Sequence, residues 1–297
     1  IRRTPTKIDP TPRRDAGIAD PELRPAVDPL RGDVDRPGED DAAAGSIVRS
    51  VDLVTSRTFR SERPKVITMT EHELAPYLRP TACVESDAPA VQAFAARVTA
   101  GTATATERAV RLFYAVRDEI RYDPYGIVLT RDGLRATAVL ERGAGFCIAK
   151  AVVLAAGARA AGIPARLGFA DVRNHLTTEH LRSQMGTDVF AFHGFTELHL
   201  DGRWVKATPT FNQSLCDRLG VKPLEFDGHT DSLLHPFDTT GQRHMEYLRD
   251  RGTHIDVPID EMRAVFAEHY PGLVADHPTQ GDFEAEATAD RDVATRR

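Results

Sequence analysis

Gly143-Ala-Gly-Phe-Cys147-Ile-Ala-Lys-Ala-Val-Val-Leu-Ala-Ala-Gly-Ala-Arg-Ala-Ala-Gly162-Ile-Pro164 is the stretch that decides the predicted fold. Its apolar positions Ile148, Val152 and Ala155 recur at helical spacing, and the glycine and proline at its end are a usual helix-ending signal. The stretch therefore predicts a helix that begins at Cys147. Free backbone N–H groups and the positive end of the helix dipole favour a thiolate at this position, so we expect the pKa of the thiol to be lowered.

Two interpretations of Cys147 follow from this position. A thiol with a lowered pKa at the start of a helix is what a catalytic nucleophile needs. The alternative is a small apolar residue that is buried beneath the helix and takes part in no reaction. The residues downstream of the helix decide between the two.

The composition is that of an ordinary globular protein. The chain has 297 residues, of which 41% are hydrophobic and 28% charged, enough for one sizeable domain with flanking tails. A formal net charge of -6 provides no basic face, so we expect neither a nucleic acid nor a membrane as partner. The sequence has no run of about 18 apolar residues and no apolar signal core near its start, so we expect a cytoplasmic protein.

The cysteines predict free thiols. There are three of them, Cys83, Cys147 and Cys216, and none has the CxxC spacing of a zinc site or a disulfide framework. His193 and His199 lie about 20 Å apart if both are on one strand, too far to share a metal ion. We therefore expect no metal and no cofactor.

The two ends of the chain differ from its middle. Residues 1–64 carry many prolines among alternating Arg and Asp, which predicts a disordered or extended arm. Residues 273–297 are charged, and from about Asp276 onward they have no large apolar residue apart from Phe283, which predicts a disordered tail. The folded domain is therefore expected over residues 65–272.

Within this domain, local patterns predict mainly helices before the cysteine and strands after it. Thr104 and Glu107 fit a capping box at the start of a helix over 105–121. Residues 173–187 read as a polar loop with room for one helical turn, and the chain beyond Asn212 reads as irregular. The other expected elements are strands at 65–70 and 165–172 and helices at 72–77, 88–98, 136–141, 245–249 and 259–270.

Residues 189–200 and 203–210 predict a β-hairpin, because they flank Asp201-Gly202, a strong two-residue turn signal. Glu197 then lies opposite Lys206, and these opposite charges support the register. The same register opposes four further pairs: Leu200 with Arg203, His199 with Trp204, Phe195 with Thr208, and His193 with Thr210. Opposed side chains lie about 5 Å apart and diagonal ones about 7–8 Å, so Thr208 and Thr210 are the hairpin residues nearest His193.

The chain has, in this order, a cysteine at a helix start, a histidine on a strand and a polar residue on the next strand. A thiolate nucleophile, its base and the group that orients the base require this order. These residues closely resemble the transglutaminase-like superfamily. The resemblance is carried by Gly145-Phe-Cys147, by Gly162-Ile-Pro-Ala-Arg166, and by His193, Glu197, Leu200-Asp-Gly-Arg-Trp-Val205 and Pro209-Thr210. It covers residues 105–212 most strongly.

The resemblance implies that Cys147 is the nucleophile and His193 its general base. The third residue of the family is an aspartate directly before the Pro-Thr pair, and this chain has Thr208 there. A threonine hydroxyl can accept a hydrogen bond from the imidazole, but it cannot stabilise imidazolium by charge. Neutral orienting groups do serve in papain-like proteases. Asn212 is either a substitute orienting residue or a residue of a turn or strand end.

Four residues are candidate substrate contacts: Phe146, Tyr125, His175 and Asn212. His175 and His180 lie in the polar loop, where they either line a groove or are ordinary surface residues. The backbone N–H of Cys147 is one natural donor of an oxyanion hole. Tyr122 or Tyr125 is a candidate for the second donor.

Together these features predict an α+β fold resembling papain and transglutaminases, in which the helix of Cys147 packs on an antiparallel sheet that carries His193. The expected function is acyl transfer, or amide or peptide hydrolysis, through a thioester on a peptide, protein or small acyl substrate. The alternative is a catalytically weakened or inactive member of the fold that binds peptides or proteins. Thr208 favours this alternative, and the presence of both Cys147 and His193 speaks against it.

Overall fold

A computed structural model describes residues 69–175, 177–233, 244–270 and 281–295. The chain divides into a unit Ile1–Ser61 and a unit Glu62–Arg297, and every described residue belongs to the second. The predicted arm over residues 1–64 and most of the predicted strand at 65–70 lie outside the described residues.

Four antiparallel strands form the main sheet, in the order β5-β4-β3-β6. Their bounds are β3 (Ala165–Asn174), β4 (Val189–Leu200), β5 (Arg203–Ala207) and β6 (Met245–His254). A second, two-stranded parallel sheet pairs β1 (Arg121–Tyr122) with β2 (Ala144–Gly145), directly before Cys147. The fold is therefore α+β, as the sequence predicts.

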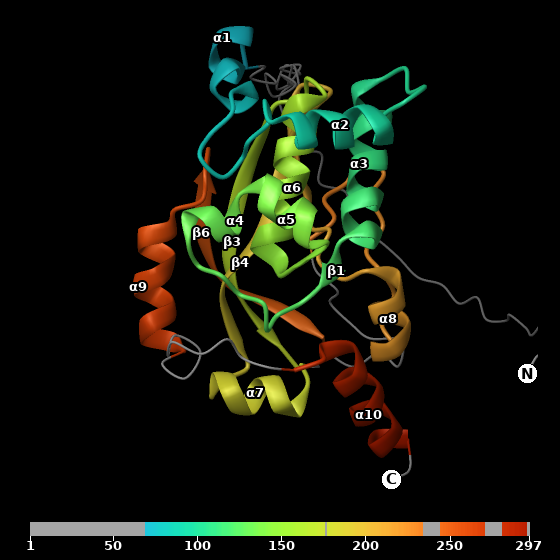
Figure 1. The fold of residues 1–297 in the computed structure, drawn as a ribbon, viewed down its shortest axis with the longest axis vertical. Coiled ribbons are helices and arrows are strands. Elements are labelled where there is room, and N and C mark those ends of the chain that lie inside the picture. The colour runs from blue at the N-terminus through green and yellow to red at the C-terminus, as the bar shows by residue number, and fades with distance from the viewer. Residues whose placement is uncertain (1–68, 176, 234–243, 271–280, 296–297) are drawn as a thin grey trace, which may run out of the picture. The chain divides into compact units, whose positions relative to one another are not determined.

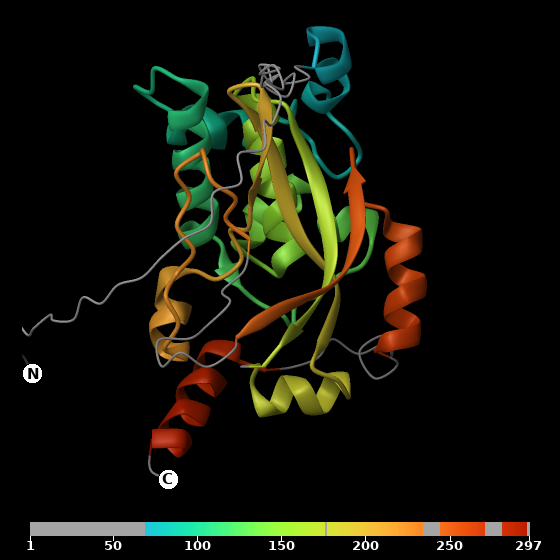
Figure 2. The same ribbon diagram turned by 180° about the vertical axis from the view of Figure 1, so that it is seen from behind.

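Helices cover one face of the main sheet, and Figure 1 shows α6 and α5 in front of the long strands β3 and β4, with α2 and α3 to the right of α6. Seen from behind in Figure 2, the strands lie in front of these helices, with α9 beside β6. The helices before β3 are α1 (Glu71–Leu74), the 3-10 helix η1 (Ala75–Leu78), α2 (Pro89–Val98), α3 (Ala105–Glu119), α4 (Arg131–Leu134), α5 (Ala136–Arg142) and α6 (Cys147–Ala160). Those after it are α7 (Glu179–Met185), α8 (Gln213–Leu219), α9 (Ile259–His269) and α10 (Phe283–Thr295).

α6 forms the centre of the core. Its residues from Ile148 to Arg159 are buried on every side, which its sequence, apolar apart from Lys150 and Arg159, permits. The Thr196 hydroxyl on β4 donates a 2.9 Å hydrogen bond to the carbonyl of Ala151 and so ties the helix to the sheet. Lys150 is also buried, and its ammonium donates to carbonyls at the end of α3.

Elements with strong local signals form where the sequence predicts them. The capping box of Thr104 and Glu107 is present at the start of α3. α2, α5, α6, α9 and β3 also lie within a few residues of their predicted bounds. The hairpin register is confirmed at the pairs Leu200–Arg203, His199–Trp204 and Glu197–Lys206.

The hairpin is shorter than predicted. Its ladder ends at the pair Thr196–Ala207, so the predicted oppositions of Phe195 with Thr208 and of His193 with Thr210 are wrong. The cause is a competing partner, because the N–H of Thr208 donates to the carbonyl of Ser232 at 2.9 Å. The chain leaves β4 at this point and follows residues that are distant in the sequence.

Several other expectations are also wrong. Residues 245–249 begin strand β6 and not a helix, because they pair with β3. Residues 283–295 form helix α10 and not a disordered tail, because Phe283 packs on the rings of Tyr122 and Tyr125. The polar loop contains a seven-residue helix, α7, and the chain after Asn212 begins helix α8.

Candidate active site

Cys147 is the first residue of α6, and the segment before it is held in place by the small parallel sheet. Tyr122 pairs with Gly145 in that sheet. A Cβ atom at Gly145 would lie 2.7 Å from the Cβ of Ala149, so only glycine lets the segment turn this closely into the helix. Phe146 is the N-cap residue and caps no N–H group with its side chain, which leaves the N–H groups of the first turn available at Cys147.

Strand β4 approaches the start of α6 closely at Gly194. A Cβ atom there would lie 2.9 Å from the Cα of Ile148, a backbone contact that no side chain could accommodate without a shift. The N–H groups of Gly194 and Ile148 both donate to the sulfur of Cys147. The glycine after His193 therefore brings the strand of the histidine to the sulfur.

A β-bulge lies immediately before His193. Phe192 has a φ of +55°, in the left-handed region that is costly for an aromatic residue. Its N–H donates to the carboxylate of Asp171 at 3.1 Å. Arg251 donates to the same carboxylate oxygen at 2.5 Å, and its guanidinium stacks on the Phe192 ring at 4.4 Å from the ring centre. This buried network holds the strained residue and so fixes the backbone from which His193 projects.

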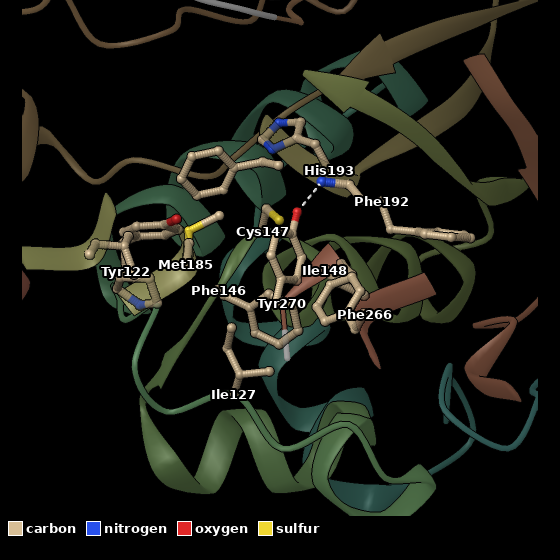
Figure 3. Close-up of a pocket in the computed structure, with 14 residues that line it drawn as sticks. Tyr122, Ile127, Phe146, Cys147, Ile148, Met185, Phe192, His193, Phe266 and Tyr270 are labelled. Carbon is tan, nitrogen blue, oxygen red and sulfur yellow. Dashed lines mark hydrogen bonds between the residues drawn. The ribbon is translucent and has the colours of Figure 1, made fainter. Parts of the chain in front are cut away.

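Cys147 and His193 line the same pocket (Figure 3). The pocket contains about 460 Å³ of empty space, counted out to its open mouth. In the view of Figure 3, the thiol lies beside the hydroxyl of Tyr270 and below the imidazole of His193. The structure thus brings together the two residues that the sequence predicts as nucleophile and base.

Tyr270 is a residue of the site that sequence reasoning missed. Its hydroxyl donates to the carbonyl of Val189 at 2.9 Å and accepts from the N–H of Ala191, the contact dashed in Figure 3. The pKa of Tyr270 lies well above its ordinary value because the ring is buried. A predicted helix over 259–270 gave no sign that its last residue would reach β4, since that contact depends on how α9 packs.

The pKa of the Cys147 thiol is raised to about 11, because the apolar surroundings disfavour the charged form. Hydrogen bonds from the N–H groups of Gly194, Ile148 and Cys147 itself lower the pKa, but by less. The predicted lowering is therefore wrong for the resting protein. The helix start acts on the sulfur as expected, and desolvation outweighs it.

Thr208 is buried, and its hydroxyl has no hydrogen-bond partner among the residues that the structure describes. It is also absent from the described residues that line the pocket. The hydrogen bond that the sequence suggests between Thr208 and His193 is therefore not present. The early end of β5 at Ala207 accounts for this difference.

Of the four candidate substrate contacts, Phe146 lines the pocket, whereas Tyr125, His175 and Asn212 do not. The Tyr125 hydroxyl donates to Glu286 on α10. His175 lies 3.6 Å from a carboxylate oxygen of Glu246 on β6.

Asn212 has a structural role close to the site. It is the N-cap residue of α8, and its side-chain oxygen accepts from the N–H of Tyr122 at 3.1 Å. Its amide donates to Ser214 at 2.7 Å and to Glu284 at 3.3 Å. Asn212 thus anchors the segment of Tyr122, in agreement with its interpretation as a turn residue and not as an orienting group for His193.

A cysteine at the start of a central helix, packed against an antiparallel sheet that carries a histidine in the same pocket, defines the papain- and transglutaminase-like class of fold. Residues 92–209 match the family model of the transglutaminase-like superfamily. No curated protein matches the sequence significantly.

Two solved structures are similar to the chain. One is named a "putative cysteine protease" from Cytophaga hutchinsonii, with 17% identity and a TM-score of 0.41 over 65% of this chain and 50% of that one. The other is named a "putative protease" from Parabacteroides distasonis, with 17% identity and a TM-score of 0.29 over 43% of this chain and 26% of that one. The chain thus spans half the length of the first and about a quarter of the second.

None of the helices among the described residues has both the length and the apolar character that crossing a bilayer requires. In the same part of the chain, no three His, Cys, Asp or Glu side chains are grouped as the ligands of a metal ion.

Proposed function

We propose that the protein is a cysteine-dependent enzyme that transfers an acyl group, from an amide or an activated acyl donor, through a thioester on Cys147. The acceptor is water or an amine, and the donor is a peptide, a protein or a small acyl compound. The observation that carries the proposal is the single pocket lined by both Cys147 and His193. A cysteine and a histidine that share one pocket are the two residues that a nucleophile and its base require.

The raised pKa of Cys147 indicates how the nucleophile forms. The resting thiol is neutral, so His193 takes the Sγ proton as the sulfur attacks the carbonyl carbon. A C–S bond forms, the π electrons move to the carbonyl oxygen, and the backbone N–H of Cys147 donates to this oxyanion. The bond to the leaving group then breaks, and His193 gives the proton to that group. The product is a thioester on Cys147.

The second step regenerates the enzyme. Water or an amine attacks the thioester, and His193 takes the proton of the attacking group. The C–S bond then breaks, the sulfur leaves with that proton, and the acid or the new amide departs. Hydrolysis and transfer share the first step, so the same residues serve both outcomes.

The proposal is tested by treating the purified protein with a p-nitrophenyl acyl ester and following nitrophenolate release together with intact mass. We expect a rapid phase of one nitrophenolate per chain and a mass increase of one acyl group, localised to Cys147 by peptide mapping. Cys147→Ala should lose both signals, and His193→Ala should lower the acylation rate about 100-fold or more. A wild-type rate that persists in Cys147→Ala would refute the proposal.

A catalytically inactive binding module is the second candidate. Two observations favour it: Thr208 stands where the family has an aspartate, and the thiol of Cys147 is neutral at rest. In that case the protein forms no acyl adduct with the p-nitrophenyl ester, yet an unreactive peptide in the pocket protects Cys147 from alkylation.

A further inference from the structure

Apolar side chains form the walls of the pocket around Cys147 and His193 (Figure 3). They come from the loop after β1, the N-cap of α6, helix α7, strand β4 and helix α9: Ile127, Phe146, Leu181, Met185, Phe190 and Phe266. Among the described residues that line the pocket, none is Asp, Glu, Lys or Arg. A charged group that entered this pocket would therefore lose its water without gaining an opposite charge.

The polar groups of the pocket are few, and one of them, the hydroxyl of Tyr270, is already engaged. Besides Cys147 and His193, the polar side chains on the walls are those of Tyr122 and Tyr270. The single hydroxyl proton of Tyr270 is donated to the carbonyl of Val189. A carboxamide or carboxylate beside the reacting carbonyl would thus leave hydrogen-bonding groups unsatisfied, which costs binding free energy.

We propose that this pocket binds the acyl group of the substrate and selects donors whose group beside the reacting carbonyl is apolar and uncharged, an aliphatic chain or an aromatic ring. The inference rests on the proposed function. The acyl group stays on the sulfur through both steps, whereas the leaving group departs after the first. A pocket around Cys147 therefore contacts the acyl group throughout the reaction.

The side chains on the pocket walls agree with this occupant. Met185 on α7 is unbranched and can adjust its shape, so the pocket is expected to accept apolar groups of several lengths. The pocket is therefore expected to discriminate against charged acyl groups more strongly than against apolar groups of a particular shape.

The test is a series of p-nitrophenyl esters with one leaving group and different acyl groups. Hexanoyl and 3-phenylpropanoyl esters carry apolar groups, a 4-carbamoylbutanoyl ester carries an amide, and a glutaryl ester carries a carboxylate. Each acylation rate constant of the wild-type protein is divided by the rate constant of the same ester with free cysteine. This division corrects for differences in intrinsic reactivity between the esters. We expect the apolar esters to react at least about 30-fold faster than the glutaryl ester, with the amide in between.

A matched pair of variants tests the same point from the side of the protein. Ile127→Lys places an ammonium in the pocket, whereas Val128→Lys places one on the neighbouring residue, which is 44% exposed and outside the pocket. Ile127→Lys should lower the preference for the apolar esters at least about tenfold, and Val128→Lys should keep the wild-type preference. The wild-type series decides the proposal even if Ile127→Lys does not fold.

The outcomes separate this inference from the proposed function. Equal corrected rates for all esters, with acyl groups on Cys147, would overturn the inference and leave the proposed function standing. Faster reaction of the glutaryl or amide ester would overturn it in the same way. If no ester acylates Cys147, both are refuted.

Discussion

At the residue scale, Cys147 shows two opposing effects on one sulfur. N–H groups of the helix start and of β4 donate to it, as the sequence predicts, while the apolar pocket raises its pKa to about 11. An enzyme with such a resting thiol depends on its base at the moment of attack. In the proposed mechanism, His193 therefore takes the proton of the thiol in each turnover and is not the partner of a preformed thiolate.

This account predicts the pH dependence of alkylation. The rate of iodoacetamide reaction with Cys147 should rise about tenfold per pH unit from pH 6 to pH 9, because the reactive thiolate remains a small fraction below the pKa of about 11. The rates are measured by mass spectrometry, with Cys147→Ala as the control for reaction at Cys83 and Cys216. A rate that is already constant between pH 6 and pH 8 would show a preformed thiolate and contradict the account.

The sequence prediction and the structure differ in the role that they give to the Thr208 hydroxyl. If its hydroxyl orients His193, Thr208→Val should lower kcat by an order of magnitude or more. The structure gives that hydroxyl no hydrogen-bond partner among the described residues, so we expect kcat to change less than about threefold and stability to be unchanged or slightly higher. Ester turnover and thermal unfolding of the variant distinguish the two results.

The pairing of Cys147 with His193 could be predicted because each residue lies within a strong local pattern, a helix start and a hairpin strand. The orienting residue could not be predicted in the same way. Its hydrogen bonds depend on where β5 ends, and the contact between Thr208 and Ser232 decides that. The place of Tyr270 in the site could not be predicted either, because it depends on how α9 packs against β4.

At the element scale, the close approach of β4 to α6 brings the strand of His193, the proposed base, to the helix start of Cys147, the proposed nucleophile. Gly194→Ala would place a Cβ atom 2.9 Å from the Cα of Ile148 and push the strand away. We expect acylation to fall about 100-fold, because a displacement of about 1 Å disrupts the alignment of the reacting groups.

Gly157→Ala is the matched control for this prediction. Gly157 lies on α6, the helix that Gly194 contacts from β4, and the nearest neighbour of its added Cβ atom would be the side-chain end of Leu112 at 3.1 Å, which can move. Acylation by Gly157→Ala should stay within about twofold of the wild type. Equal losses in both variants would show that any bulk added in or against α6 impairs activity, contrary to the account.

The sequence and the structure lead to different expectations for residues 283–295, which form helix α10. A disordered tail predicts that Phe283→Ala has no effect on stability. The structure buries Phe283 against the rings of Tyr122 and Tyr125, so we expect the free energy of unfolding to fall by about 3 kcal/mol or more. Urea unfolding measures the loss, and Ala289→Ser at an exposed position of α10 should change it by less than about 0.5 kcal/mol.

Elements with internal signals, such as the capping box of α3 and the Asp201-Gly202 turn, could be predicted from the sequence alone. β6 and α10 could not, because their stability comes from partners elsewhere in the chain. Residues 245–254 become a strand by pairing with β3. α10 depends on Phe283 and on the aromatic rings of the segment that leads to the active site.

At the scale of the whole molecule, buried Lys150 links α3 to the central helix. Its ammonium donates to the carbonyls of Arg117 at 2.9 Å and Ile120 at 2.6 Å. Burial lowers its pKa from an ordinary value of 10.5 to about 7. Above pH 7 the unfolded chain therefore holds one proton more than the folded chain, and stability must rise with pH.

The prediction is that the free energy of unfolding of the wild type, relative to that of Lys150→Met, increases from pH 6.5 to pH 8.5. The slope can reach at most about 1.4 kcal/mol per pH unit. Urea unfolding at several pH values measures it, and other titrating groups cancel in the difference. A difference that is constant with pH would mean that Lys150 keeps its ordinary pKa.

The class of fold and the matched superfamily could be predicted from the sequence, since both depend on the helix of Cys147 and on the hairpin of His193. The walls of the pocket could not. They come from α7, α9 and the loop after β1, elements that only the folded chain brings together. Those walls lead to the inference about the acyl group.

The central claim is that Cys147 carries the acyl group and that His193 moves the proton. Rapid-quench intact mass spectrometry of the wild type, Cys147→Ala and His193→Ala with a p-nitrophenyl hexanoate tests it most directly. The account predicts a single acyl adduct on Cys147 that forms and decays in the wild type, no adduct in Cys147→Ala, and slow formation in His193→Ala. An adduct that forms equally fast without His193, or on another residue, would contradict it.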